Sequence, residues 1–387
     1  MGQESSSNEL RHDWLSDRWV IFAPQRSQRP VDFSEYRPPV AGCESCPFCA
    51  GNESATPAPI AEYASLSSAQ RGLDWQVRVV PNKFPAVNGV ASLSWISPSS
   101  SAGKSARPEP STHCGTCSSG KHADSQSRID LFAKRCATGA HEVIIESPEH
   151  CRSFSQLDKH DAELVFRAYR DRLRHWANCL DIEYAVLFKN VGYEAGASLV
   201  HPHSQLIATN LLPTDVQRVV QRMELFHRQE NRCLHCRMLE AEIATATRMI
   251  AMSPSFAAFC PFASRFPAQV TLLPVRHESS FESLADAELN ELSEFVQSII
   301  RALEQTYADA SYNYIVHTAP RIQRQTTAFH WRIEFFPRLT KVAGFEWGSD
   351  CYINPLTPEA AAKQLREHVQ PLYAANLAAI TFDKKLS

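Results

Sequence analysis

Two stretches of the chain carry the same series of landmarks in the same order, and this internal duplication constrains the fold more than any other feature. Each series starts at a Cys-x-x-Cys pair, passes a Phe-Pro turn, an apolar strand, a histidine and an Asp-Ala-Glu-Leu segment, and ends at a strand beside a second histidine. His150 and His201 are 51 residues apart in the first series, whereas His277 and His330 are 53 residues apart in the second. The chain is therefore predicted to fold as two related halves.

Each half combines one amphipathic segment with strands rich in β-branched and aromatic residues. The apolar spacing predicts one helix that starts near Asp161 and another that starts near Asp286, each with one buried face. We expect an α+β fold in which each half is an antiparallel sheet with a packed helix. The predicted divisions are residues 1–215 and 216–387. A strand over 19–22 and a closing helix capped by Thr357 complete the expected elements.

Composition excludes several classes of function. The chain has 387 residues, 44% of them hydrophobic, and a formal net charge of -3, which speaks against a nucleic acid partner. Its apolar runs are too short to span a bilayer, and the first residues lack the features of a secretion signal. We expect a cytoplasmic protein with no membrane partner.

The first half contains a Ser-rich excursion over about residues 88–135, which we expect to be mobile. Cys114 and Cys117, together with His113 and His122, have the spacing of metal ligands within it. A small metal knuckle in this segment is one open interpretation, although few core-forming residues flank it.

The strand that ends the first series places three polar side chains on alternate positions. His201, His203 and Gln205 would share one face of a strand, just after the small-residue turn over 196–198. Polar groups are costly to bury without a partner, so a functional face is favoured over a row of ordinary surface polars. A neutral imidazole beside such a turn can attack phosphorus, and Gln205 can donate to a phosphoryl oxygen.

The second series lacks this arrangement. Arg332 occupies the position of His203, and Glu334 occupies that of Gln205. If an imidazole performs the chemistry, only the first half can perform it. One active site per chain is the consequence.

Four residues at matched landmarks of the first half form a Cys2His2 set, namely Cys46, Cys49, His150 and His201. This set suits tetrahedral zinc and leaves no open coordination position, so the ion would be structural. The alternative is that both cysteines are buried as small apolar residues and that His150 only ends a strand.

Several separated motifs resemble the galactose-1-phosphate uridylyltransferases of the histidine-triad superfamily. The likeness extends from about Trp14 to Arg366, outside the Ser-rich excursion. The motifs are Gly-Ala-Ser before His-Pro-His-Ser-Gln, Cys-Pro-Phe-Cys-Ala-Gly-Asn, Ser147 to His150, and Arg26-x-x-Arg29-Pro30. The resemblance implies two histidine-triad-like halves and a double displacement, in which UMP passes from UDP-glucose to a histidine and then to galactose 1-phosphate.

The resemblance also assigns roles. His203 matches the nucleophile, Gln205 matches the residue that stabilises the nucleotidylated state, and the Cys2His2 set matches structural zinc ligands. Positions that contact the nucleotide sugar and the hexose 1-phosphate are matched by Arg26, Arg29, Asn82, Asn190, Ser198, Phe345 and Glu346. Phe345 stands where many members have tyrosine, and its turn is expected to meet the sugar across a homodimer interface.

A second metal site is predicted less completely. Cys233, Cys236 and His330 are present, whereas the alignment places Ser255 at the fourth ligand position. His235, Cys260 and His317 are the candidate substitutes.

Three alternative functions remain open. ADP-glucose phosphorylases share this frame, the Phe-Glu turn and the segment from Cys351 to Pro355. A non-catalytic zinc-containing nucleotide-binding protein would not require an imidazole at position 203. A zinc-dependent hydrolase would require an open coordination position and a nearby carboxylate, which the first-half set does not offer.

Overall fold

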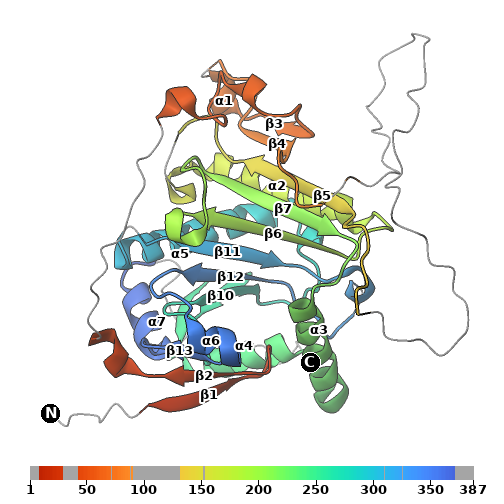
Figure 1. The fold of residues 1–387 in the computed structure, drawn as a ribbon. Coiled ribbons are helices and arrows are strands. Elements are labelled where there is room, and N and C mark those ends of the chain that lie inside the picture. Colours follow the sequence, from red (N-terminus) through yellow and green to blue (C-terminus); the bar gives the residue numbers. More distant parts are fainter. Residues whose placement is uncertain are drawn as a thin grey trace, which may run out of the picture.

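A ten-stranded antiparallel sheet forms the centre of the molecule (Figure 1). The computed structural model describes residues 8–28, 42–70, 72–87, 89, 131–150, 153–308, 310–324 and 326–370. In sheet order the strands are β3 (Ala61–Tyr63), β4 (Val77–Pro81), β5 (Gly139–Ile145), β7 (His203–Thr209), β6 (Tyr184–Val191), β11 (Tyr312–His317), β12 (Arg332–Pro337), β10 (Val270–Pro274), β9 (Phe256–Phe259) and β8 (Met249–Met252).

The strand order is symmetric about the pairing of β6 with β11. The order on one side, β6-β7-β5-β4-β3, corresponds to β11-β12-β10-β9-β8 on the other. Asn190 faces Asn313 at this junction, and Phe188 faces Ile315. The α+β class and the two related halves are confirmed, and the structure adds that both halves share one continuous sheet.

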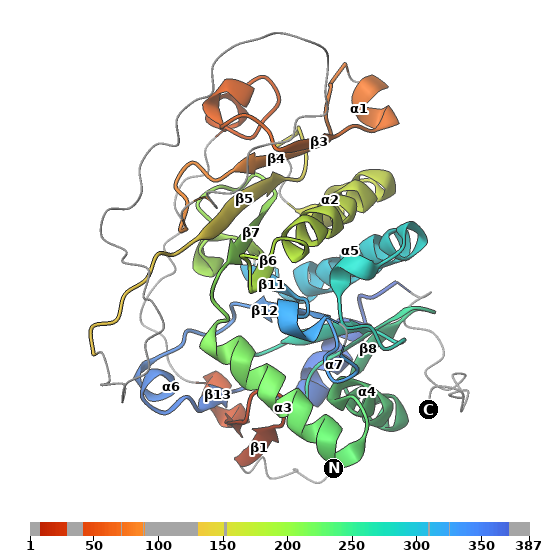
Figure 2. The ribbon, with the colours of Figure 1, turned by 90° about the vertical axis from the view of Figure 1, so that its right-hand side faces the viewer.

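Two long helices cover one face of the sheet (Figure 2). They are α2 (Lys159–Ala177) and α5 (Asp286–Thr306), one from each half, and they pack against each other. The predicted core positions are buried, with Tyr169 and Leu289 fully inaccessible. The Asp158 side chain caps α2 by accepting from the Asp161 amide, which satisfies a free donor of the first turn.

The first strands of the chain join the second half. β1 (Glu9–Asp13) pairs antiparallel with β2 (Arg18–Phe22), and β2 pairs parallel with β13 (Tyr352–Asn354). This small sheet lies beside α6 (Gly344–Ser349) and α7 (Pro358–Arg366) (Figure 1). The predicted strand over 19–22 and the Thr357 cap, which accepts from the Ala360 amide, are both present. The division at residue 215 stays a prediction, because the small sheet combines both ends of the chain.

The remaining helices are α1 (Leu66–Gln70), α3 (Thr214–Glu230) and α4 (Leu234–Thr245). Arg29 and the candidate knuckle residues Cys114, Cys117, His113 and His122 lie outside the described residues, as does most of the Ser-rich excursion. Within the described part, no helix combines the length and the apolar character that a bilayer span requires.

Candidate functional site

The strand β7 separates two kinds of side chain. His203 and Gln205 point away from α2, whereas Ser204 points toward it and contacts Tyr169 of that helix. His203 is the first residue of the strand and only 7% exposed. Of the three residues predicted to share a strand face, His203 and Gln205 do so on β7, whereas His201 precedes the strand. His203 is largely shielded from solvent.

Hydrogen bonding determines the tautomer of His203. Its Nδ1 lies 2.7 Å from the His201 carbonyl oxygen, which can only accept, so Nδ1 carries the proton. Burial lowers the pKa of His203, which favours the neutral ring. The Phe48 ring packs edge-on against the imidazole, with 5.2 Å between ring centroids. Nε2 is thus left with a lone pair on an imidazole of restricted orientation.

Gln205 belongs to a small polar cluster with His141 and Asn82. The Ala86 amide donates to His141 Nδ1 over 3.2 Å, so the proton of the neutral ring resides on Nε2. His141 Nε2 then donates to Gln205 Oε1 over 2.8 Å. The Asn82 side-chain oxygen accepts from the Phe84 amide over 2.8 Å. This arrangement leaves the amide nitrogen of Gln205 as the group that can donate to a ligand.

The structure brings together only some of the predicted substrate contacts. Asn190 lies on β6 and accepts a 2.7 Å hydrogen bond from Asn313. Ser198 is exposed, two residues after Gly196, whose φ of 82° is one that glycine tolerates. The Gly196 and Ala197 amides are already bonded within the turn. Asn190 and Asn82 thus have partners in the protein, whereas Ser198 is open to solvent.

Three predicted contacts lie elsewhere in the chain. Arg26 is exposed just after β2, beside the small sheet. Phe345 and Glu346 lie on α6, which both views place away from β7 (Figures 1 and 2). Phe345 is 49% exposed. A single chain therefore does not bring these two residues to His203.

The first Cys2His2 set converges in space. Cys46, Cys49, His150 and His201 place their ligand atoms within 4.8 Å of one another. His201 Nε2 donates to the Ser147 carbonyl over 2.8 Å, which leaves Nδ1 free to ligate, and burial lowers the pKa of His201 to about 4. Two cysteine sulfurs and two imidazole nitrogens fit a tetrahedral metal ion.

A second Cys2His2 cluster differs in its fourth member from the set expected from the sequence. Cys233, Cys236, His277 and His330 also place their ligand atoms within 4.8 Å of one another. His277 Nδ1 lies 3.5 Å from the Cys236 sulfur. Ser255, the residue aligned to the fourth ligand, instead donates to Glu291 and is not part of this cluster.

The three substitutes considered do not join this second set. Cys260 is buried in the apolar core, His235 is buried outside the set, and His317 pairs with Glu334. The duplication could have indicated His277 as a member of this cluster, because His277 occupies the place of His150 in the second series.

A buried polar network behind β7 was missed by sequence reasoning. Lys189 forms an ion pair with Glu146, and its Nζ also donates to the His203 carbonyl over 3.3 Å. Tyr169 donates to Glu146 over 2.6 Å and lies 2.6 Å from the hydroxyl of Tyr314 in the other half. These groups satisfy one another, as buried polar groups must. The network supports the backbone of His203 from the helix side.

Known proteins resemble this chain in sequence and in fold. The model of the family "Galactose-1-phosphate uridyl transferase, N-terminal domain" matches residues 116–213. An ADP-glucose phosphorylase from Arabidopsis thaliana is 31% identical over 368 residues, covering 94% of each chain. A galactose-1-phosphate uridylyltransferase from Thermotoga maritima is 25% identical over 369 residues, covering 93% of this chain and 98% of the relative.

A solved structure resembles the whole chain. It is a crystal structure of an ADP-glucose phosphorylase from Arabidopsis thaliana with bound ADP-glucose. Its TM-score is 0.73 at 29% identity, with 94% of this chain and 99% of that chain covered. The similarity therefore extends over both halves of the fold.

Proposed function

Since the chain belongs to the galactose-1-phosphate uridylyltransferase family, we propose that it transfers a nucleoside monophosphate from a nucleotide sugar through a covalent intermediate on His203. The observation that carries this proposal is the protonation of Nδ1, which leaves the lone pair on Nε2 of a buried, neutral imidazole. Such a group is a competent nucleophile toward phosphorus.

Two displacements follow from this assignment. First, His203 Nε2 attacks the α-phosphorus of the nucleotide sugar and forms an N–P bond, while the bond to the bridging oxygen breaks and hexose 1-phosphate leaves. Next, a phosphate oxygen of the acceptor attacks the same phosphorus, and the N–P bond breaks to release the new nucleotide product. The imidazole regains its lone pair, so the chain is unchanged after one cycle.

Gln205 stabilises the charge that develops on the phosphoryl oxygens. Its amide nitrogen is the available donor because His141 occupies its carbonyl oxygen. Asn82, Asn190, Ser198, Arg26 and Arg29 are the proposed nucleotide and phosphate contacts. Homodimerisation would bring Phe345 and Glu346 of one subunit to the sugar in the other.

Zinc is the proposed occupant of both Cys2His2 sets. Each set offers four ligands and leaves no open coordination position, so the ion would stabilise the fold and take no part in the transfer at His203. The first ion would hold His201, and with it the carbonyl that orients His203. A non-catalytic zinc-containing nucleotide-binding protein remains the alternative that the experiment below must exclude.

Two donor and acceptor pairs suit this mechanism. One is UDP-glucose with galactose 1-phosphate, the exchange predicted from the sequence. The other is ADP-glucose with inorganic phosphate, which is favoured by the 31% identity and the TM-score of 0.73 to ADP-glucose phosphorylase. We place ADP-glucose first among the donors to be tested.

The test is single-turnover incubation of the protein with each nucleotide sugar in the absence of acceptor. We expect one equivalent of hexose 1-phosphate per active site and an acid-labile nucleotidyl adduct, detected by mass spectrometry on the peptide that contains His203. His203→Asn should form no adduct and lose about 10⁴-fold or more in turnover. His175→Asn, a change on the surface of α2, is the matched control. Absence of an adduct with every donor would refute the mechanism and favour the non-catalytic alternative.

A further inference from the structure

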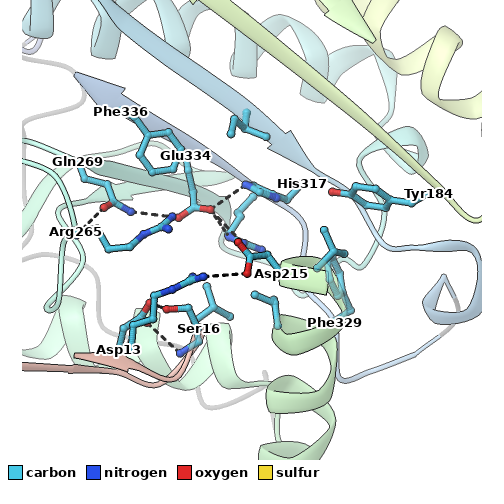
Figure 3. Close-up of a pocket in the computed structure, with 16 residues that line it drawn as sticks. Asp13, Ser16, Tyr184, Asp215, Arg265, Gln269, His317, Phe329, Glu334 and Phe336 are labelled. Atoms are coloured by element: carbon cyan, nitrogen blue, oxygen red, sulfur yellow. Dashed lines mark hydrogen bonds and ion pairs between the residues drawn. The ribbon is translucent and has the colours of Figure 1, made fainter. Parts of the chain in front are cut away.

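The second half retains a cavity at the position that corresponds to the active site. Arg332 and Glu334 lie on β12 where His203 and Gln205 lie on β7. They line a cavity of about 200 Å³ (Figure 3). The second half therefore has open space beside Arg332, although no imidazole stands at this position.

The polar contacts of the two sites correspond as well. Gln269 Nε2 donates to Glu334 Oε1 over 3.3 Å, just as His141 Nε2 donates to Gln205 Oε1 over 2.8 Å. Gln269 precedes β10 and His141 lies on β5, and these two strands occupy equivalent places in the sheet. Arg332 is not a nucleophile, so this cavity can bind a ligand but cannot form a covalent intermediate at this position.

Two cationic side chains on the cavity wall retain unused binding capacity. Arg332 is 3% exposed, and its Nε and Nη2 atoms lie 3.2 and 3.1 Å from one oxygen of Glu334. Its Nη1 is buried and has no hydrogen-bond partner among the described residues. The Arg265 guanidinium packs against the rings of Phe266 and Phe336, and no described residue forms an ion pair with it. A buried donor without a partner is costly, and an anion would relieve that cost.

The acidic groups that line the cavity are already engaged, which argues against a cationic ligand. Asp13 accepts from the Leu15 amide and from the Ser16 hydroxyl. Glu334 is held by Arg332, and also by His317 at 2.9 Å. Asp215 is paired with Arg18 at 2.9 Å. The Arg265 guanidinium and Arg332 Nη1 are therefore the groups left for a ligand.

The rest of the cavity is apolar and reaches solvent. Val216 and Val219 of α3, together with Ile315 and Phe329, contribute the apolar part of its lining. The Asp215 side chain at the start of α3, which also lines the cavity, is 64% exposed to solvent. A suitable ligand combines an anionic end with a less polar body.

We propose that this cavity is a non-covalent binding site for a small organic phosphate monoester. The phosphate accepts from Arg332 Nη1 and from Arg265, and the organic part packs against the apolar wall. Guanidinium groups recognise phosphate oxygens well because they present several donors in a planar fork. The site does not depend on the transfer reaction proposed for His203, because neither His203 nor Gln205 lines the cavity.

The test counts ligands per chain by titration calorimetry of the full-length protein with glucose 1-phosphate and with inorganic phosphate. The double variant R332Q/E334Q removes the free donor without leaving Glu334 unpaired. Val219→Phe fills the cavity from the apolar side and changes no charge. Arg276→Gln, an exposed site outside the cavity, is the matched control. Metal content and melting temperature establish that each variant is folded.

We expect R332Q/E334Q and Val219→Phe each to lower the affinity of one class of sites for glucose 1-phosphate at least tenfold. Arg276→Gln should leave this affinity unchanged. Crystals soaked in glucose 1-phosphate should show phosphate density beside Arg332 and Arg265. Unchanged isotherms in either folded cavity variant, or no density at saturation, would overturn the proposal. Equal affinity for inorganic phosphate and the ester would refute the role of the apolar wall.

Discussion

The imidazole of His203 donates from Nδ1 to the backbone carbonyl of His201, 2.7 Å away. His201 in turn belongs to the first Cys2His2 set through its own Nδ1. The proposed metal ligand and the proposed nucleophile are thus coupled through a single backbone carbonyl. This coupling joins the two proposed roles, one structural and one chemical, at the start of β7.

Loss of the Gln205 amide should slow transfer without preventing substrate binding. We expect Gln205→Ala to lower kcat by about 10²- to 10³-fold, because one donor to the developing charge is removed. His141→Ala should lower kcat less, since Gln205 remains but loses the partner on its carbonyl oxygen. Steady-state kinetics check this, with Gln364→Ala on α7 as the control. A change confined to KM would contradict the assigned role.

The second metal set predicts that His277, and not Ser255, is a ligand. His277→Ala should lower the metal content from two ions per chain to one, measured by elemental analysis of the purified protein. Cys49→Ser should also remove one ion, from the other half, and should lower the melting temperature because metal binding stabilises the folded state. Ser255→Ala should retain both ions. Two ions in His277→Ala would show that this residue is not required.

The buried pair of Lys189 and Glu146 predicts a large effect on stability. Lys189→Met leaves the Glu146 carboxylate buried without its cation, which should cost about 3–5 kcal/mol in the free energy of unfolding. The double variant K189M/E146Q should recover part of this loss. Arg228→Met breaks an exposed pair with Glu224 and should cost about 1 kcal/mol or less. Urea unfolding measures all three, and equal losses for Lys189→Met and Arg228→Met would contradict the network.

Asp286 at the start of α5 predicts a dependence of stability on pH. The hydrogen bond from Arg170 lowers the pKa of Asp286 in the folded state. The ionised carboxylate of Asp286 therefore stabilises the folded protein fully above its pKa in the unfolded state, which is about 4 for a free aspartate. This stabilisation is lost as the pH falls through the lower pKa of Asp286 in the folded state. Asp286→Asn should lower the melting temperature at pH 7, and the difference from the parent protein should shrink below about pH 4. A constant difference between pH 7 and pH 2.5 would refute this.

Much of the fold follows from patterns that are local in sequence. The spacing of apolar residues predicted α2 and α5, and the Thr357-Pro358 pair predicted the start of α7. These features depend on periodicity and capping, which act within a few residues. The pairing of β2 with β13 could not be predicted in this way, because more than 300 residues separate the partners.

The sequence by itself determined the duplication, the two helix and sheet halves, the first Cys2His2 set and the asymmetry between His203 and Arg332. Order along the chain and strand alternation are enough for those inferences. Only the tertiary structure joined the halves into one sheet and brought His277, and not Ser255, into the second Cys2His2 cluster. It placed Lys189 behind His203. It also opened a cavity in front of Arg332. The reason is physical: ligand sets, buried networks and cavities depend on distances between side chains far apart in sequence, and packing alone sets those distances.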